Sequence, residues 1–215
     1  MTTCAICPVE IGITHRAGAR TCSARCRKAY SRLHPAAKVA ARYGIPVSDM
    51  WRSPGWVVRQ AAELAEVPAW DLDAAACELD HVAPMWFGSG GIVADALAVS
   101  SWAAPTPATK AGAVWCNPPY SGRGGHLAAW VAAGIRAADD GAVVVMLLPA
   151  SIGSVWFGRA HLRGRVWRYP RRLAFVPPTD SPGRLGGPRH DSILVELRPD
   201  GAGAGEFVSI TRDCG

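Results

Sequence analysis

The tetrapeptide Asn117-Pro118-Pro119-Tyr120 has residue types suited to chemistry on a planar nitrogen. It follows the apolar run 113–116 and precedes the glycine-rich segment 121–125. Two prolines restrict the backbone, so the Asn amide oxygen and the first proline carbonyl can act as two acceptors at one point. An amino group bound in this way loses conjugation with its ring, and its lone pair turns toward an electrophile, while the tyrosine ring offers a stacking surface. The motif predicts methyl transfer to an exocyclic amino nitrogen, although Pro-Pro after a strand is also a common loop opening.

Two pairs of cysteines near the start of the chain have the spacing of a metal site. Cys4 pairs with Cys7 and Cys22 with Cys26, with 14 residues between the pairs. Each pair can direct two thiolates at one ion, and two pairs complete a tetrahedral zinc site. Because so short a segment cannot bury a core, the metal would supply its folding free energy. We therefore predict a structural Zn²⁺ bound by these four residues.

The residues around and after the second cysteine pair are basic. A helix is expected to begin there, and it carries Arg25, Arg27, Lys28 and Arg32. These side chains are available to phosphate groups, and nothing in their pattern indicates base reading. The interpretation is a zinc module that grips a nucleic-acid backbone. The alternative is a zinc-stabilised structural tail or a module for protein contacts.

The net charge of +6 is unevenly distributed along the chain. Residues 1–43 carry eight Lys or Arg and one acid, residues 44–150 five basic and ten acidic residues, and residues 159–198 nine basic and three acidic residues. Two basic segments around an acidic middle favour a nucleic acid as the partner, and leave room for a cationic cofactor in the centre.

Other features of the sequence narrow the class of protein. No run of about 18 apolar residues predicts a membrane span, and no secretory signal is expected. Seven cysteines, an odd number, favour a reducing compartment, so we expect a cytoplasmic protein. A monomer is the default expectation for its oligomeric state.

The pattern of apolar residues predicts an α/β domain with a mostly parallel sheet that closes with antiparallel strands. Strands are expected at residues 67–72, 113–116, 142–148, 165–169, 173–176, 191–197 and 206–210, and helices at residues 55–66 and 125–138. Ser53 is the expected N-terminal cap of the first helix, with Pro54 at its first position. In such sheets ligands bind beyond the carboxyl ends of strands, so Asp73 and Asn117 are expected at the same rim. The predicted domains are a basic zinc module, residues 1–43, and the α/β domain, residues 44–215.

Several short motifs in the α/β domain occur together in one known family. They are Trp51-Arg52-Ser53-Pro54, Trp70-Asp71-Leu72-Asp73-Ala74-Ala75, His81-Val82-Ala83-Pro84, Asp95-Ala96-Leu97, Trp115-Cys116-Asn117-Pro118-Pro119-Tyr120-Ser121, Leu147-Leu148-Pro149-Ala150 and Arg172-Leu173-Ala174-Phe175. In this order they resemble the phage-type Dam DNA N-6-adenine methyltransferases over about residues 49–197. The resemblance implies the Rossmann-like, S-adenosyl-L-methionine-dependent methyltransferase fold, and a protein encoded by a phage or prophage in a bacterial host.

The resemblance also implies roles for individual residues. Asn117 and Pro118, followed by Pro119, would accept hydrogen bonds from the amino group of adenine, and Tyr120 would stack on the flipped base. The residues implied for S-adenosyl-L-methionine are Ser53, Pro54, Asp73, Ala74, Asp95 and Asn117. Ser53 replaces the family's threonine, and Ala96 replaces its glycine. For Asp73, the alternative is a strand-end residue that caps the next helix.

Two other activities and one inactive alternative remain open from the residues alone. The same tetrapeptide suits the N-4 amine of cytosine or a protein glutamine amide. A catalytically inactive, zinc-containing DNA-binding protein is the alternative from a different class.

Cys116 lies within the expected strand and is interpreted as a packing residue, because direct transfer to an amine needs no thiol nucleophile.

Overall fold

The computed structural model describes residues 51–120, 126–176 and 190–211, together with residues 2–3, 7–8, 10–11, 22–26, 29 and 49. The chain divides into two units, residues 1–52 with 176–187 and residues 53–175 with 188–215. The predicted domain boundary at residue 43 lies outside the described residues and stays a prediction.

The smaller unit contains little described secondary structure. Strand β1 (Thr2–Thr3) pairs antiparallel with β2 (Glu10–Ile11). Arg52 and Val176 form an antiparallel bridge through two backbone hydrogen bonds, of 2.9 and 3.0 Å.

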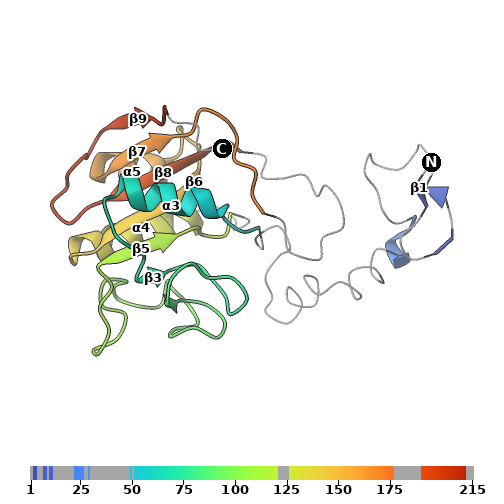
Figure 1. Ribbon diagram of the computed structural model, residues 1–215, viewed down its shortest axis with the longest axis horizontal. Coiled ribbons are helices and arrows are strands. Elements are labelled where there is room, and N and C mark those ends of the chain that lie inside the picture. The colour runs from blue at the N-terminus through green and yellow to red at the C-terminus, as the bar shows by residue number, and fades with distance from the viewer. Residues whose placement is uncertain are drawn as a thin grey trace. The chain divides into compact units, whose positions relative to one another are not determined.

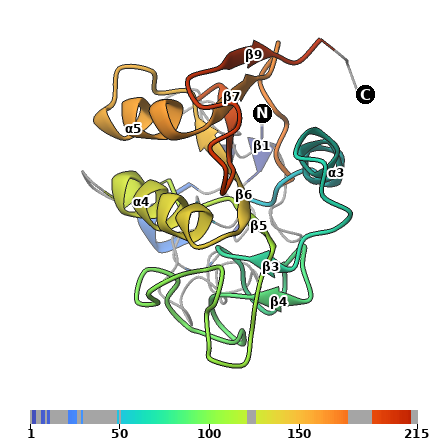
Figure 2. The same ribbon diagram turned by 90° about the vertical axis from the view of Figure 1, so that its left-hand side faces the viewer.

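The larger unit is built on a seven-stranded sheet in the order β4-β3-β5-β6-β8-β7-β9 (Figure 1; β4 is labelled in Figure 2). The strands are β3 (Leu72–Asp73), β4 (Met85–Trp86), β5 (Ala113–Cys116), β6 (Val143–Pro149), β7 (Arg165–Arg168), β8 (Ser192–Leu197) and β9 (Phe207–Ser209). Neighbours are parallel except at β8, which runs antiparallel to both β6 and β7. This confirms the predicted α/β fold with a mostly parallel sheet and antiparallel closing strands.

Helices cover both faces of the sheet. Helix α3 (Gly55–Leu64) lies on one face, and α4 (His126–Asp139) and α5 (Val155–Arg163) lie on the other (Figure 2). None of the helices in the described part of the chain is long and apolar enough to cross a membrane.

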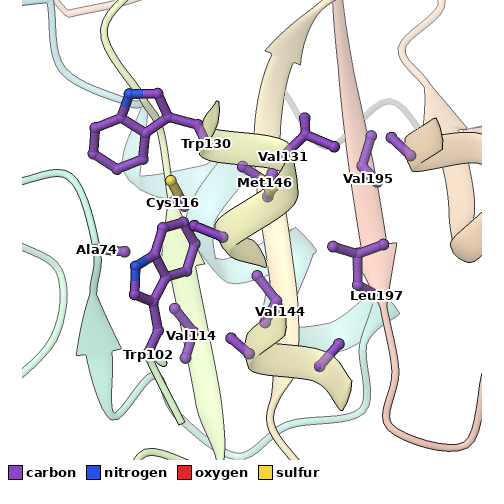
Figure 3. Packing of buried hydrophobic residues seen from close by; sticks show 14 of the residues in the cluster. Ala74, Trp102, Val114, Cys116, Trp130, Val131, Val144, Met146, Val195 and Leu197 are labelled. Carbon is purple, nitrogen blue, oxygen red and sulfur yellow. The ribbon is translucent and has the colours of Figure 1, made fainter. Parts of the chain in front are cut away.

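The two faces of the sheet have different cores because side chains alternate along each strand. Val114, Cys116, Val144 and Met146 belong to the cluster that packs against α4, with Trp102 and Trp130 also in it (Figure 3). The intervening residues face α3. They include Trp115, whose ring lies 5.7 Å from that of Trp70, while the Trp70 indole donates to the Val58 carbonyl of α3.

Helix α3 runs opposite to the parallel strands. The carbonyl of its C-cap residue Ala65 accepts a hydrogen bond from Arg198. Arg198 follows the end of antiparallel β8 and so lies at the amino edge of the parallel strands. Trp56, in the first turn of α3, packs edge-on against Tyr169, the residue after β7. The N-terminal end of α3 therefore lies at the carboxyl edge of the parallel strands, the edge where Asp73 and Asn117 are found.

Three expectations about local structure need correction, and one strand was missed. The strand expected at 67–72 is only Leu72–Asp73. Val67 N still donates to Ala62 O of α3, and Pro68 has no backbone N–H for a sheet hydrogen bond. Residues 173–176 form no strand beyond the single bridge at Val176. The N-cap of α3 is Pro54, without a side-chain hydrogen bond, so Ser53 is not the cap. Strand β4 was not expected, since its two residues lie between loops and leave no pattern.

Candidate active site

The ends of β3 and β5 lie side by side at the carboxyl edge of the sheet. Asp73, the last residue of β3, is paired with Trp115 of β5, and Asn117 follows β5 directly. From β3 the chain passes to β4 on one side, and β5 lies on the other side, so this is the point where the strand order reverses. Open α/β sheets bind their ligands in the crevice at such a point. The structure thus brings together the two residues that the sequence predicted at this rim.

The Asp73 carboxylate is buried and is bound by two backbone amides. Oδ1 accepts from Ala75 N at 3.2 Å, and Oδ2 accepts from Val82 N at 3.1 Å. The pKa of Asp73 is raised to about 6, mainly by burial and in small part by the nearby Asp80, against the opposing effects of the two amides and His81. A buried carboxylate that is ionised at neutral pH needs a cation beside it. The residue can therefore bind the positively charged end of a cofactor.

Asn117 and Tyr120 contact one another at the end of β5. Both side chains are half-buried, as is Pro119, while Pro118 is buried. The Tyr120 hydroxyl lies 2.9 Å from Asn117 Oδ1 and 2.8 Å from the carbonyl oxygen of Leu147 in β6. Burial raises the pKa of Tyr120 well above its ordinary value, so the hydroxyl stays protonated. Sequence reasoning predicted the tyrosine ring as a stacking surface and missed the bond between its hydroxyl and β6.

Cys116 is fully buried and belongs to the core cluster beneath α4. Burial raises the pKa of this thiol well above its ordinary value, and the nearby Asp73 charge raises it further. A thiol held in its neutral form is a poor nucleophile. Its surroundings agree with the interpretation of Cys116 as a packing residue.

The other predicted cofactor residues occupy different positions. Ser53 is half-buried and Pro54 buried at the N-terminal end of α3, and Ala74 is buried next to Asp73. Asp95 is exposed in the loop after β4, where its Oδ1 accepts from Leu97 N at 2.9 Å. That bond is local and does not connect Asp95 to Asp73.

An aromatic pair beside Asp73 received no role from sequence reasoning. The rings of His81 and Trp86 are stacked, with centroids 4.0 Å apart and planes 7° apart. The His81 ring bonds through Nδ1 to the Ala83 carbonyl at 2.9 Å, and Trp86 is the register partner of Asp73. The only sequence signal was the presence of His81 in one of the family motifs.

Three of the predicted zinc ligands lie together in the smaller unit. The Sγ–Sγ distances are 3.4 Å for Cys7–Cys22, 3.7 Å for Cys22–Cys26 and 3.5 Å for Cys26–Cys7. A disulfide requires about 2.05 Å, whereas thiolates at 2.3 Å from a tetrahedral Zn²⁺ are about 3.8 Å apart. The three thiols therefore fit a zinc site. Cys4, the predicted fourth ligand, lies outside the described residues.

The predicted phosphate-binding residues are only partly described. Arg25 is exposed, one residue before Cys26. Arg27, Lys28 and Arg32 lie outside the described residues, so their roles stay predictions. In the larger unit, Arg168, Arg171 and Arg172 are exposed at and just after the end of β7. This is the carboxyl edge of the parallel strands, where the candidate site also lies.

The sheet order, the antiparallel β8 and the residues at the carboxyl edge define the Rossmann-like methyltransferase fold. Residues 42–209 match the family described as DNA N-6-adenine-methyltransferase (Dam). The match covers well over half of the 215 residues, and the chain belongs to this family. Comparisons with curated proteins and with solved structures gave no match.

Proposed function

We propose that this protein transfers a methyl group from S-adenosyl-L-methionine to the N-6 amino group of adenine in DNA. The observation that carries the proposal is the position of Asn117-Pro118-Pro119-Tyr120 beside the buried Asp73, at the point where the strand order reverses. Family membership supplies the adenine base and the DNA substrate.

The cofactor-binding part of the site centres on Asp73. Asp73 is 4 % exposed. The two backbone amides that donate to its carboxylate are neutral, so these hydrogen bonds do not balance its negative charge. S-adenosyl-L-methionine carries a cationic ammonium group and, when bound, supplies a methyl group on a cationic sulfonium. Ser53, Pro54 and Ala74 would line its methionine end, and Asp95 is the candidate for its adenosine end.

The substrate-binding part of the site is the loop after β5. Asn117 and the Pro118 carbonyl would accept the two hydrogens of the adenine amino group, and the Tyr120 ring would stack on the flipped base. Two acceptors bind the amine better as it becomes pyramidal, which favours the transition state over the ground state. The amine itself would attack the methyl group, whose bond to the cofactor sulfur breaks as the bond to nitrogen forms, leaving a neutral thioether. The nitrogen then releases one proton, so no covalent enzyme intermediate is required.

The zinc module would add affinity for DNA. Exposed Arg25 lies one residue before the metal ligand Cys26, and the three further basic residues after it extend a positively charged segment. Contacts of this kind bind phosphates and position the duplex without reading bases.

The test is a nucleoside mass analysis of unmethylated DNA incubated with the purified protein and S-adenosyl-L-methionine, beside Asn117→Ala. N-6-methyladenine formed by the native protein and absent with the variant would support the reaction and the acceptor. N-4-methylcytosine would keep the chemistry and change the base. If no methylated base forms on any DNA, while the protein still binds DNA, the inactive binding protein becomes the better interpretation.

A further inference from the structure

The Leu147 carbonyl lacks its regular partner in the sheet. The ladder between β5 and β6 begins with Val143 N donating to Gly112 O, and its register pairs Cys116 with Met146. In a parallel ladder the bonds repeat every two residues. Continued in this way, the ladder places the Leu147 carbonyl opposite the nitrogen of residue 118. That residue is proline, which has no N–H to donate.

The Tyr120 hydroxyl takes the place of the missing amide. It lies 2.8 Å from the Leu147 carbonyl oxygen, and Leu147 itself is fully buried. A buried carbonyl without a donor is costly, and a backbone carbonyl can only accept. The single hydrogen of the hydroxyl is therefore committed to Leu147.

This commitment leaves the contact between Tyr120 and Asn117 to be explained. Asn117 Oδ1 lies 2.9 Å from the Tyr120 hydroxyl oxygen. The one hydroxyl hydrogen cannot serve both this oxygen and the Leu147 carbonyl at full strength. The two ends of a carboxamide have nearly the same shape, so hydrogen-bond partners decide which end carries the oxygen. If Nδ2 faces the hydroxyl, the amide donates to Tyr120 and every group is satisfied.

We propose that Tyr120 is a positioning residue that sets the polarity of the Asn117 carboxamide. In this arrangement Asn117 Nδ2 donates to the Tyr120 hydroxyl, and the hydroxyl donates to the Leu147 carbonyl. The carboxamide oxygen then points away from Tyr120, free to accept the target amino group. The opposite polarity would present an N–H donor to an amine, which has no acceptor to offer once its lone pair attacks. This inference rests on the proposed function and adds to it a role for the hydroxyl, separate from stacking by the ring.

Tyr120→Phe separates the two roles because it keeps the ring and removes only the hydroxyl. The matched control is Tyr169→Phe, the same change at a tyrosine that packs against Trp56. We expect Tyr120→Phe to lower kcat about tenfold, the effect of one hydrogen bond, with KM for DNA and for S-adenosyl-L-methionine unchanged. Tyr169→Phe should leave kcat unchanged. A Tyr120→Phe protein with native kcat, or with only a raised KM for DNA, would overturn the inference.

A second measurement does not depend on activity. In the ¹⁵N side-chain amide spectrum of the native protein, the Asn117 signal is assigned by its absence in Asn117→Asp. One of its two amide protons should show a nuclear Overhauser contact to the Tyr120 ring and should exchange slowly with water. In Tyr120→Phe this slow exchange should be lost. If neither amide proton is near Tyr120 in the native protein, the proposed polarity is wrong. A native protein that shows this contact but methylates no DNA would sink the proposed function and leave the arrangement itself intact.

Discussion

The Asp73 carboxylate is bound by the backbone amide of Val82 at 3.1 Å, which joins the end of β3 to the loop that leads to β4. This loop carries Asp80 and His81, whose charges act on Asp73 in opposite directions. The carboxylate is thus buried, accepts hydrogen bonds from two backbone amides and has a pKa of about 6. Two predictions depend on this arrangement.

We predict that binding of S-adenosyl-L-methionine weakens as the pH falls through about 6. The cofactor ammonium stays charged between about pH 5 and 7. The change in affinity over that range therefore reports the ionisation of Asp73, whose pKa is about 6. Below pH 6 a proton must leave for each cofactor bound, and the affinity should fall about tenfold per pH unit. Titration calorimetry from pH 5 to 8 measures this, with Asp73→Asn as the variant that binds weakly at every pH. A native affinity that is flat across this range would contradict the role of Asp73.

We predict the opposite pH trend for the stability of the cofactor-free protein. The pKa of Asp73 is raised from 3.8 to about 6 on folding, so its contribution to stability is fully present below pH 3.8 and is lost as the pH rises through 6. A shift of this size corresponds to about 3 kcal/mol at most. Asp73→Asn is neutral throughout, so its melting temperature relative to the native protein should rise between pH 5 and pH 8. An equal difference at both pH values would show that the carboxylate is not destabilising in the absence of a cation.

We predict that one Zn²⁺ is bound per chain and that Cys26→Ser removes it. The three described thiols lie 3.4–3.7 Å apart, close to the spacing in a zinc–thiolate site. The matched control is Cys77→Ser, a half-buried cysteine of the larger unit that lies outside this cluster. Metal content by plasma mass spectrometry should fall to near zero in the first variant and stay at one in the second. Retention of the metal in both would exclude the site, and Cys4→Ser tests the predicted fourth ligand.

We predict that Arg198→Met lowers the free energy of unfolding by about 2 kcal/mol. Arg198 Nη1 donates to the buried Glu196 at 2.9 Å and to the Ala65 carbonyl of α3 at 2.9 Å, so its loss removes two bonds at once. Arg165 and Trp167 would remain as partners of Glu196 and limit the loss. Arg159→Met, on the exposed side of α5, is the control and should cost less than about 0.5 kcal/mol. Urea unfolding of both variants makes the comparison; equal losses would mean that the two bonds of Arg198 together are not stabilising.

Patterns confined to one segment were predictable from the sequence. The apolar runs that form β5 and β6 are long enough to be recognised, and the expected bounds differ from the observed ones by no more than a residue. The two long helices follow from their spacing of apolar residues. The close approach of Cys7, Cys22 and Cys26 follows from ligand spacing, which depends only on nearby residues. Family motifs located the candidate site because they place chemistry-bearing residues directly after strands.

Features that depend on residues far apart in the chain were decided by the tertiary structure. Strand β4 has only two residues, and it exists because β3 offers it a parallel edge. Glu196 is a charged residue, yet it is fully buried in β8, because β7 supplies Arg165 and Trp167 as hydrogen-bond donors on the same face. The partner of the Tyr120 hydroxyl lies 27 residues away on β6, where Pro118 leaves a carbonyl without its amide. Sequence patterns therefore determined which residues could do chemistry, and the register between strands decided which groups those residues face, because register is set by long-range packing.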